Sequence, residues 1–171
     1  MPRRALRRVE FVASVPGAVL ADMADLRREA DGWINLLPGV DEEDDQPEGQ
    51  SLFSVFGTRR QGVTMATWMP PRPGRRGGEV VHLGIAHSAG DRVGRFLATA
   101  GHPVPGGWRV DQDHPRRGLI VLVPPAEPDE EVLAWALAAT AALCTRRLTG
   151  SWQAEVYLPP GRVDPGGPAP G

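Results

Sequence analysis

The sequence predicts an α+β fold, with a mostly antiparallel sheet of about seven strands and three helices. Two observations predict it. Residues 79–158 contain, in order, a strand, a helix, two strands, a helix and a strand. Residues 8–71 and 79–125 resemble each other, as two βαββ-like halves would. The 21 glycines and 18 prolines separate these segments, which is typical of many short elements joined by turns.

The first half begins with a strand and a helix. Residues 8–14 alternate between apolar and polar side chains, which predicts a strand. Residues 16–37 carry apolar side chains at steps of three and four, which predicts a helix, and Pro16 suits its start. Pro38 and Gly39 are expected to end this helix.

A hairpin is expected next. Residues 41–50 are an acidic run without an apolar anchor and predict a solvated loop. Residues 51–57 and 63–69 have strand patterns and lie on either side of a short polar turn. Residues 70–78 are rich in proline and glycine and predict a linker to the second half.

The second half repeats this order and adds a closing helix and strand. The predicted strands cover residues 79–87, 108–111, 119–123 and 152–158, and the predicted helices cover residues 88–101 and 129–148. The residues Ser88 and Asp91 have the spacing of a capping box at the start of the first of these helices.

The order of elements in residues 79–158 is that of a ferredoxin-like βαββαβ unit. In that topology the first and third strands are central neighbours, and here Val80–Ala86 and Leu119–Val123 are continuously apolar. Residues 108–111 are polar enough for an edge strand. Strands that are apolar on both faces need cover on both sides. Either the first helix crosses the back of the sheet or a second subunit covers it.

We expect residues 1–158 to form a single α+β domain and residues 159–171 to be a disordered tail of proline and glycine. Within the domain, the pseudo-repeats at 8–71 and 79–125 are followed by a closing helix and strand at 129–158. Each pseudo-repeat contains an Arg-Arg turn, a strand and then Pro-Pro. The alternative is a coincidence between two arginine-rich hairpins.

Composition excludes several classes of protein. With 19 basic and 21 acidic residues and a net charge of −2, the chain does not have the basic character of a general nucleic-acid binder. All of the basic residues are arginine, which excludes Schiff-base lysines and the lysine of a P-loop. Cys144 is the one cysteine, which suits a cytoplasmic location. The longest apolar run, at 132–143, is too short to cross a membrane.

No cofactor or metal is expected. The chain has 4 histidines, without thiolate partners and without a pair at helical i, i+4 spacing. The sequence also lacks a convergent set of catalytic residues. The chain is therefore more readily interpreted as a binding protein than as an enzyme.

A polar cluster in the second predicted hairpin offers the alternative of catalysis. His114 could act as a base oriented by Asp113 or Asp111, with Arg116 or Arg117 holding an anionic substrate. This pattern would suit a small hydrolase or isomerase. The other interpretation is ordinary turn chemistry around a proline and a glycine.

The leading hypothesis is a non-catalytic cytoplasmic module that binds a partner protein or a small ligand, most simply as a homodimer. An anionic ligand could lie between the two βαββ halves, held by the arginine pairs of the two turns and by His82, which lies beside the small residue Gly84. The proposed ligand-binding residues are Arg59, Arg60, Arg116, Arg117 and His82. Trp135 points away from the apolar stripe of its helix, so it is a candidate interface residue. The alternative for that tryptophan is partial burial under the acidic loop or the C-terminal tail.

Overall fold

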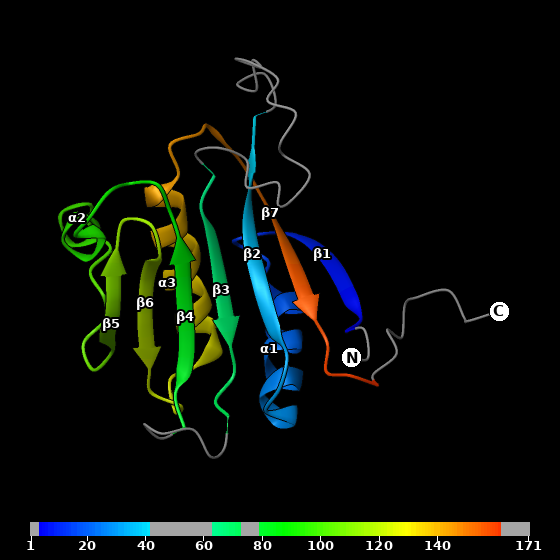
Figure 1. Ribbon diagram of the computed structural model, residues 1–171. Coiled ribbons are helices and arrows are strands. Elements are labelled where there is room, and N and C mark those ends of the chain that lie inside the picture. Colours follow the sequence, from blue (N-terminus) through cyan, green and yellow to red (C-terminus); the bar gives the residue numbers. More distant parts are fainter. Residues whose placement is uncertain (1–3, 42–62, 73–78, 162–171) are drawn as a thin grey trace.

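The computed structural model describes residues 4–41, 63–72 and 79–161, which form seven strands and three helices (Figure 1). The strands are β1 (Leu6–Val12), β2 (Trp33–Val40), β3 (Met65–Met69), β4 (Val81–Ala86), β5 (Arg109–His114), β6 (Gly118–Val123) and β7 (Leu148–Tyr157). The helices are α1 (Gly17–Glu29), α2 (Val93–Thr99) and α3 (Asp129–Leu143). The predicted α+β class is confirmed.

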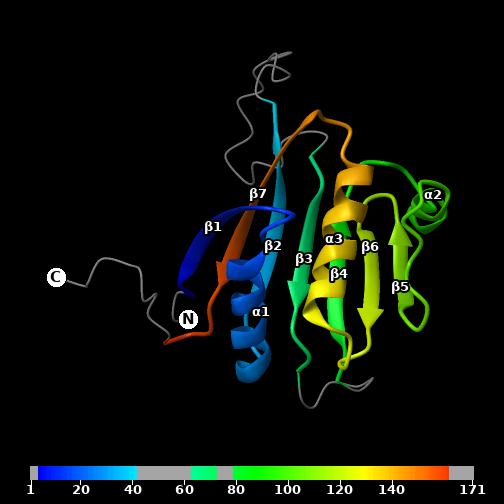
Figure 2. The ribbon, with the colours of Figure 1, turned by 180° about the vertical axis from the view of Figure 1, so that it is seen from behind.

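All seven strands join one antiparallel sheet with the order β1-β7-β2-β3-β4-β6-β5, so β3 is the middle strand. α1 and α3 lie side by side behind the strands in Figure 1 and in front of them in Figure 2. α2 lies beside the edge strand β5 and also contacts α3. The helices therefore form a second layer on one face of the sheet.

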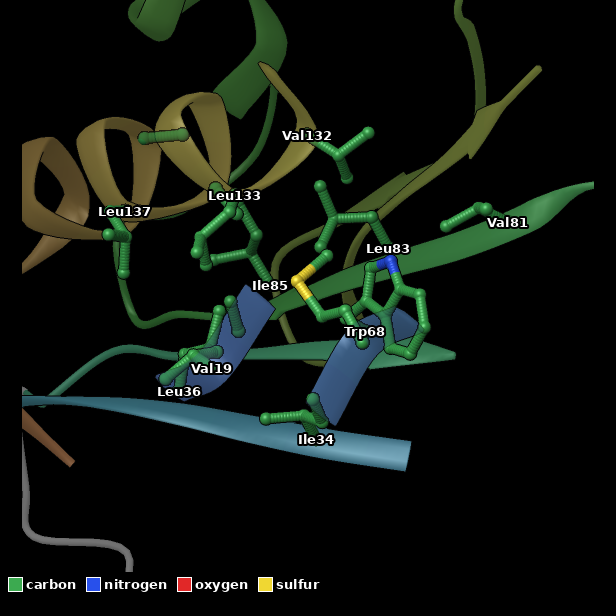
Figure 3. Packing of buried hydrophobic residues seen from close by; sticks show 14 of the residues in the cluster. Val19, Ile34, Leu36, Trp68, Val81, Leu83, Ile85, Val132, Leu133 and Leu137 are labelled. Atoms are coloured by element: carbon green, nitrogen blue, oxygen red, sulfur yellow. The ribbon is translucent and has the colours of Figure 1, made fainter. Parts of the chain in front are cut away.

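The core lies between the sheet and α1 and α3. In Figure 3, side chains from the strands, such as Trp68 and Leu83, point toward Val19 of α1 and Leu133 of α3. Trp68 is only 1% exposed. Truncating such a side chain to alanine costs about 3–5 kcal/mol, because it removes buried apolar surface and leaves a cavity. This layer therefore supplies the hydrophobic stabilisation of the fold.

The predicted pairing of the two most apolar strands is confirmed. β4 and β6 are antiparallel neighbours with strands on both sides, and β5 is an edge strand. β5 also contains an irregularity between Val110 and Gln112, a common feature of edge strands. The polarity of these three segments therefore correctly predicted their places in the sheet.

The predicted helix over residues 16–37 is wrong in its second half. α1 ends at Glu29, because Ala30 adopts a left-handed conformation and Gly32 follows with φ of +87°. Residues 33–40 are strand β2, in which every second side chain is buried. Trp33 and Leu37 are four residues apart, a spacing that fits one face of a helix and also one face of a strand.

Three further boundaries differ from the prediction. α3 ends at Leu143 rather than at residue 148, because Cys144 is already extended, with φ of −75° and ψ of 127°. β7 is correspondingly longer than predicted, and its first residue, Leu148, pairs with Val40 of β2. α2 begins at Val93, so Ser88 does not cap it as predicted.

The ferredoxin-like arrangement is not confirmed. Along the chain, β4, α2, β5, β6, α3 and β7 have the predicted order. In space, however, β7 does not pair with β4 as the closing strand of that unit would. It lies between β1 and β2, and the β2–β3 pair separates it from β4. The hydrogen bonds of β7 are therefore made to the first part of the chain.

Whether the two halves are true repeats stays a prediction. Each has the order strand, helix, strand, strand, but β4 pairs with β6 whereas β1 pairs with β7. The predicted acidic loop beyond residue 41, the strand at 51–57, and most of the linker and tail lie outside the described residues. In the described part of the chain, no helix has the length and apolar character needed to span a membrane.

Candidate functional site

The candidate site is the face of the sheet opposite α1 and α3, which we call the open face. Side chains alternate between the two faces of a strand. The residues of β2 that face the helices are buried, whereas Trp33, Asn35 and Leu37 are half-buried on the open face. The same alternation holds in β3 and β4. None of the described helices lies on this face (Figure 1).

The strand register aligns the open-face residues in three rows that cross the sheet. The first row contains Leu6, Tyr157, Trp33, Met69, His82, Leu122 and Arg109. The second row contains Arg8, Glu155, Asn35, Thr67, Gly84, Ile120 and Gln112. The third row contains Glu10, Gln153, Leu37, Met65 and Ala86. The first and third rows are largely apolar across the middle of the sheet, which is unusual for a face exposed to water.

Gly84 leaves an open space in the middle row of this face. A Cβ atom placed on Gly84 would meet no atom within 4 Å. Its neighbours in the row are Thr67 on β3 and Ile120 on β6. The face is therefore uneven there, with a small residue among larger side chains.

Several polar groups of the middle row are paired with one another. Arg8 Nε lies 3.4 Å from Glu155 Oε1, and the Thr67 hydroxyl donates to Asn35 Oδ1 over 2.9 Å. Arg8 and Arg109 balance Glu10 and Glu155, so the three rows carry no net charge with histidine neutral. Because these pairs already exist within one subunit, covering them leaves fewer unmet hydrogen bonds than covering isolated polar groups would.

An aromatic corner lies in the first row, on the neighbouring strands β7 and β2. The rings of Trp33 and Tyr157 are stacked, with centroids 4.6 Å apart and planes 13° apart. The guanidinium of Arg4 lies 5.0 Å from the Trp33 ring centroid, a cation–π distance. Burial is the main cause that raises the pKa of Tyr157, and the negative charge of Glu155 adds to it.

The arginine above Trp33 belongs to a small charged cluster. Arg4 Nη2 donates to Asp31 Oδ1 over 3.1 Å, and Arg72 Nη2 lies 3.3 Å from the same oxygen. Burial acts to raise the pKa of Asp31, but the hydrogen bond from Arg4, that from the Gly32 amide and the two positive charges together lower it. This cluster holds Arg4 over the aromatic corner.

The proposed ligand-binding residues do not converge in the described structure. Arg116 and Arg117 are exposed at the tip of the β5–β6 hairpin. His82 lies on the open face opposite Leu122 of β6. Four residues of β6 separate Leu122 from the hairpin, a distance of about 13 Å along a strand. Arg59 and Arg60 lie outside the described residues.

The junction of the two halves is also part of the sheet. β3 of the first half and β4 of the second are hydrogen-bonded over five residue pairs, from Met65 and Ala86 to Met69 and His82. The two halves thus share one continuous layer. An anionic ligand between them stays a prediction.

The residues of the catalytic alternative have separate roles in the structure. Both carboxylate oxygens of Asp113 accept hydrogen bonds from the first turn of α2, from Val93 N over 3.0 Å and from Gly94 N over 2.9 Å. His114 Nδ1 accepts from the amides of Arg116 and Arg117 over 3.1 and 3.2 Å. Asp113 thus caps a helix, and His114 closes the hairpin turn.

Asp111 is exposed and lies 3.9 Å from Arg109, so it is directed toward a neighbour on its own strand. Successive strand residues point to opposite faces, which explains why Asp113 and His114 do not pair with each other. Among the described residues, no three side chains of His, Cys, Asp or Glu come together as metal ligands would.

Trp135 packs against its own chain. Its indole Nε1 donates to the Pro103 carbonyl over 2.9 Å, and its ring meets Trp108 edge to face at 5.5 Å. The ring is half-buried. The indole N–H is therefore satisfied within the subunit. A role for Trp135 in an interface with another chain stays a prediction.

His87 was not singled out by its sequence context as a functional residue. It follows β4, and in the described structure neither of its buried ring nitrogens has a hydrogen-bond partner. Burial is the main cause that lowers its pKa, partly opposed by the negative charge of Asp113. The histidine is therefore held in its neutral form beside the cap of α2.

Of the open-face residues, only His82 was predicted as a site residue, and those of the first βαββ half were missed most clearly. Trp33 and Leu37 were assigned to a helix, and Met65, Thr67 and Met69 were noted only as part of a strand. The alternation of residues 33–40 was the available signal. It was concealed because apolar residues occupy both faces of β2.

Comparison of the chain with family models, with curated proteins and with solved structures finds no match, so the candidate site is argued from its own geometry.

Proposed function

We propose that this chain is a non-catalytic module that binds protein through its open face, and that its partner is a second copy of the chain. The observation that carries the proposal is the apolar, half-buried character of the open face, which no described helix covers. Removing apolar surface of this extent from water is favourable, so a bound partner would be stabilised by it.

The size of the open face suits a stable dimer. Seven strands spaced at about 4.8 Å and three rows of side chains at about 7 Å span about 30 by 20 Å. This is about 600 Å² for each copy and about 1,200 Å² in total, within the range of specific interfaces. A face of this size can therefore hold two copies together without further contacts.

The charge of the open face favours a second copy over a nucleic acid. In a two-fold dimer the same surface meets itself, so a charged face would repel its partner. Here Arg8 and Arg109 offset Glu10 and Glu155. A balanced face also has little attraction for phosphates, which favour an excess of positive charge.

The residue types of the aromatic corner support the same function. Tryptophan, tyrosine and arginine contribute most often to the strongest contacts of protein interfaces. Trp33 and Tyr157 are stacked side by side in the first row, and Arg4 lies over the Trp33 ring. The stacking holds these side chains in position, so less conformational entropy is lost when a partner binds.

The test is the mass of the full chain in solution, measured by light scattering after gel filtration over a range of concentrations. We expect a dimer that dissociates on dilution. Leu122→Glu places a charge on the open face and is expected to weaken association more than about 100-fold, since a buried unpaired charge costs about 3–5 kcal/mol. Val110→Glu is the matched control, because Val110 pairs with the buried Val121 and lies on the other side of the sheet.

Circular dichroism confirms that each variant is folded. A wild-type chain that is monomeric at every concentration overturns the proposal, as does a Leu122→Glu variant that associates as tightly as the wild type. A monomeric chain that binds a different protein through this face also overturns the choice of a second copy.

A further inference from the structure

We propose that the two copies are related by a two-fold axis that runs along β3, so that β2 of each copy packs over β4 of the other. This inference rests on the homodimer proposed above and defines its geometry. It also assigns the open space at Gly84 as the place that receives a side chain of the second copy.

The first argument is the position of β3 in the sheet. In the described part of the chain it is the fourth of seven strands, with three strands on either side. A two-fold axis along β3 places all seven strands of one copy over the seven strands of the other. An axis along any other strand leaves at least two strands of each copy uncovered at an edge. The axis along β3 therefore buries the largest area of the open face.

The second argument is the difference in side-chain size between β2 and β4. On the open face β2 presents Trp33, Asn35 and Leu37, whereas β4 presents His82, Gly84 and Ala86. Rotation about an axis parallel to the strands keeps each row opposite itself and exchanges the two sides of β3.

The larger side chains of β2 then face the smaller side chains of β4. Leu37 of one copy meets Ala86 of the other, and Asn35 meets the open space at Gly84. Interfaces pack as densely as protein interiors, so a large residue opposite a small one is the favourable arrangement.

The other axis that superposes the whole face is perpendicular to the strands and passes through the middle row. It would place each strand over itself in reverse. Trp33 would then meet Leu37 of the second copy, and Gly84 would meet Gly84. Such contacts crowd one strand and leave a void at another, and both crowding and voids are unfavourable in packed interfaces.

The residues of β3 itself are suited to meeting their own copies on the axis. Met65 and Met69 are half-buried on the open face, on either side of Thr67. Methionine side chains are flexible and polarisable, so they adapt to an identical side chain across a two-fold axis. The central strand can therefore lie at the symmetry axis without a clash.

The experiment is cross-linking of single cysteine variants of the full chain with a bis-maleimide whose reach matches about 10 Å, the separation of packed sheets. Cys144 is first replaced by serine, because it is the one cysteine of the chain and its thiol would also react with the maleimide. Met69→Cys places the thiol on β3, where the axis brings two copies together. Ile120→Cys is the matched control on β6, two strands away from β3. Its two copies would lie about 19 Å apart across the axis.

We expect a covalent dimer from Met69→Cys and from the second probe Met65→Cys, and none from Ile120→Cys. The perpendicular axis predicts the reverse, because it brings Ile120 opposite its own copy. Light scattering on each variant without cross-linker separates the two proposals.

If the chain is dimeric but the β3 cysteines do not link, or if Ile120→Cys links, the axis along β3 is refuted and the homodimer stands. If the chain is monomeric, the homodimer itself is refuted and the axis along β3 is refuted with it.

Discussion

Replacing Gly84 with valine separates the folding of one subunit from association through its open face. In the subunit the new side chain enters open space, since a Cβ at this position meets no atom within 4 Å. Gly84 does not have the positive φ that would strain a side chain. Valine is also a better strand residue than glycine, so the single subunit is expected to gain up to about 1 kcal/mol of stability.

In the dimer the same valine fills the space that receives a side chain of the second copy. Overpacking a close-packed contact costs about 1–3 kcal/mol, and the two-fold axis doubles this to about 2–6 kcal/mol. At about 1.4 kcal/mol for each tenfold change, the dissociation constant rises at least about 30-fold. The expected result is thus a subunit that is more stable and a dimer that is weaker.

Sedimentation equilibrium measures the dissociation constant. Urea unfolding at protein concentrations below that constant measures the stability of the single subunit. Gly106→Val is the control, because Gly106 is an exposed loop glycine whose Cβ would also meet nothing within 4 Å. Association of Gly84→Val that is unchanged, or tighter, while the chain is folded would refute the role given to the open space.

Three further predictions concern the stability of the subunit. Asp113→Ala removes the acceptor for the first turn of α2 and is expected to cost about 1–2 kcal/mol in urea unfolding, with a smaller loss for Asp113→Asn. Arg27→Met removes the partly buried pair in which Arg27 Nη2 and Nε lie 2.6 and 3.2 Å from the Asp129 carboxylate oxygens. It is expected to lower the free energy of unfolding by about 1–3 kcal/mol. Arg28→Met changes an arginine that is 74% exposed and should cost less than about 0.5 kcal/mol. His87 has a pKa below 6.5 in the fold, so as the pH falls below 6.5 the unfolded chain binds a proton that the native chain does not. The free energy of unfolding therefore decreases as the pH is lowered from 6.5 to the folded pKa. In urea unfolding across that range, His87→Gln should show a smaller decrease than the wild type.

The parts of the fold that sequence reasoning predicted correctly are those in which one pattern fits one structure. The continuous apolar runs of β4 and β6 predicted buried neighbours, and the polar β5 predicted an edge. These features depend on the polarity of a short segment alone. They could therefore be derived without knowledge of the contacts made elsewhere in the chain.

The errors lie where two patterns fit the same residues. Trp33 and Leu37 satisfy the spacing of a helix face and of a strand face, and only the left-handed Ala30 shows where α1 stops. The place of β7 beside β1 and β2 depends on contacts across more than 100 residues of sequence, such as Leu6 with Tyr157. No local pattern encodes that pairing, so the ferredoxin-like order was a reasonable expectation that the long-range pairing overrode.

The candidate site was predictable in one respect and not in another. The apolar character of both faces of β4 and β6 predicted that the sheet needs cover on two sides. The sequence could not indicate which side the first helix covers. α1 packs beside α3, and none of the described helices covers the second side. Similarly, the position of Asp113 beside His114 in the predicted hairpin turn suggested a partner for that histidine. Its carboxylate instead accepts from the first turn of α2, a contact that a turn pattern does not reveal.

The two faces of the sheet differ in a way that connects folding with association. On the helix side the side chains are almost fully buried, as with Trp68 and Leu83, at 1% and 0% exposed, so this layer alone stabilises a subunit. On the open face the side chains of the central strands are half-buried and some polar groups are already paired, as Asn35 is with Thr67. Such a face is compatible with water in the single subunit. Covering it is still favourable, because its apolar side chains are removed from solvent. Folding and dimer formation are therefore expected to be separate steps, so substitutions on the open face should change the dissociation constant and leave the unfolding of the dilute subunit nearly unchanged.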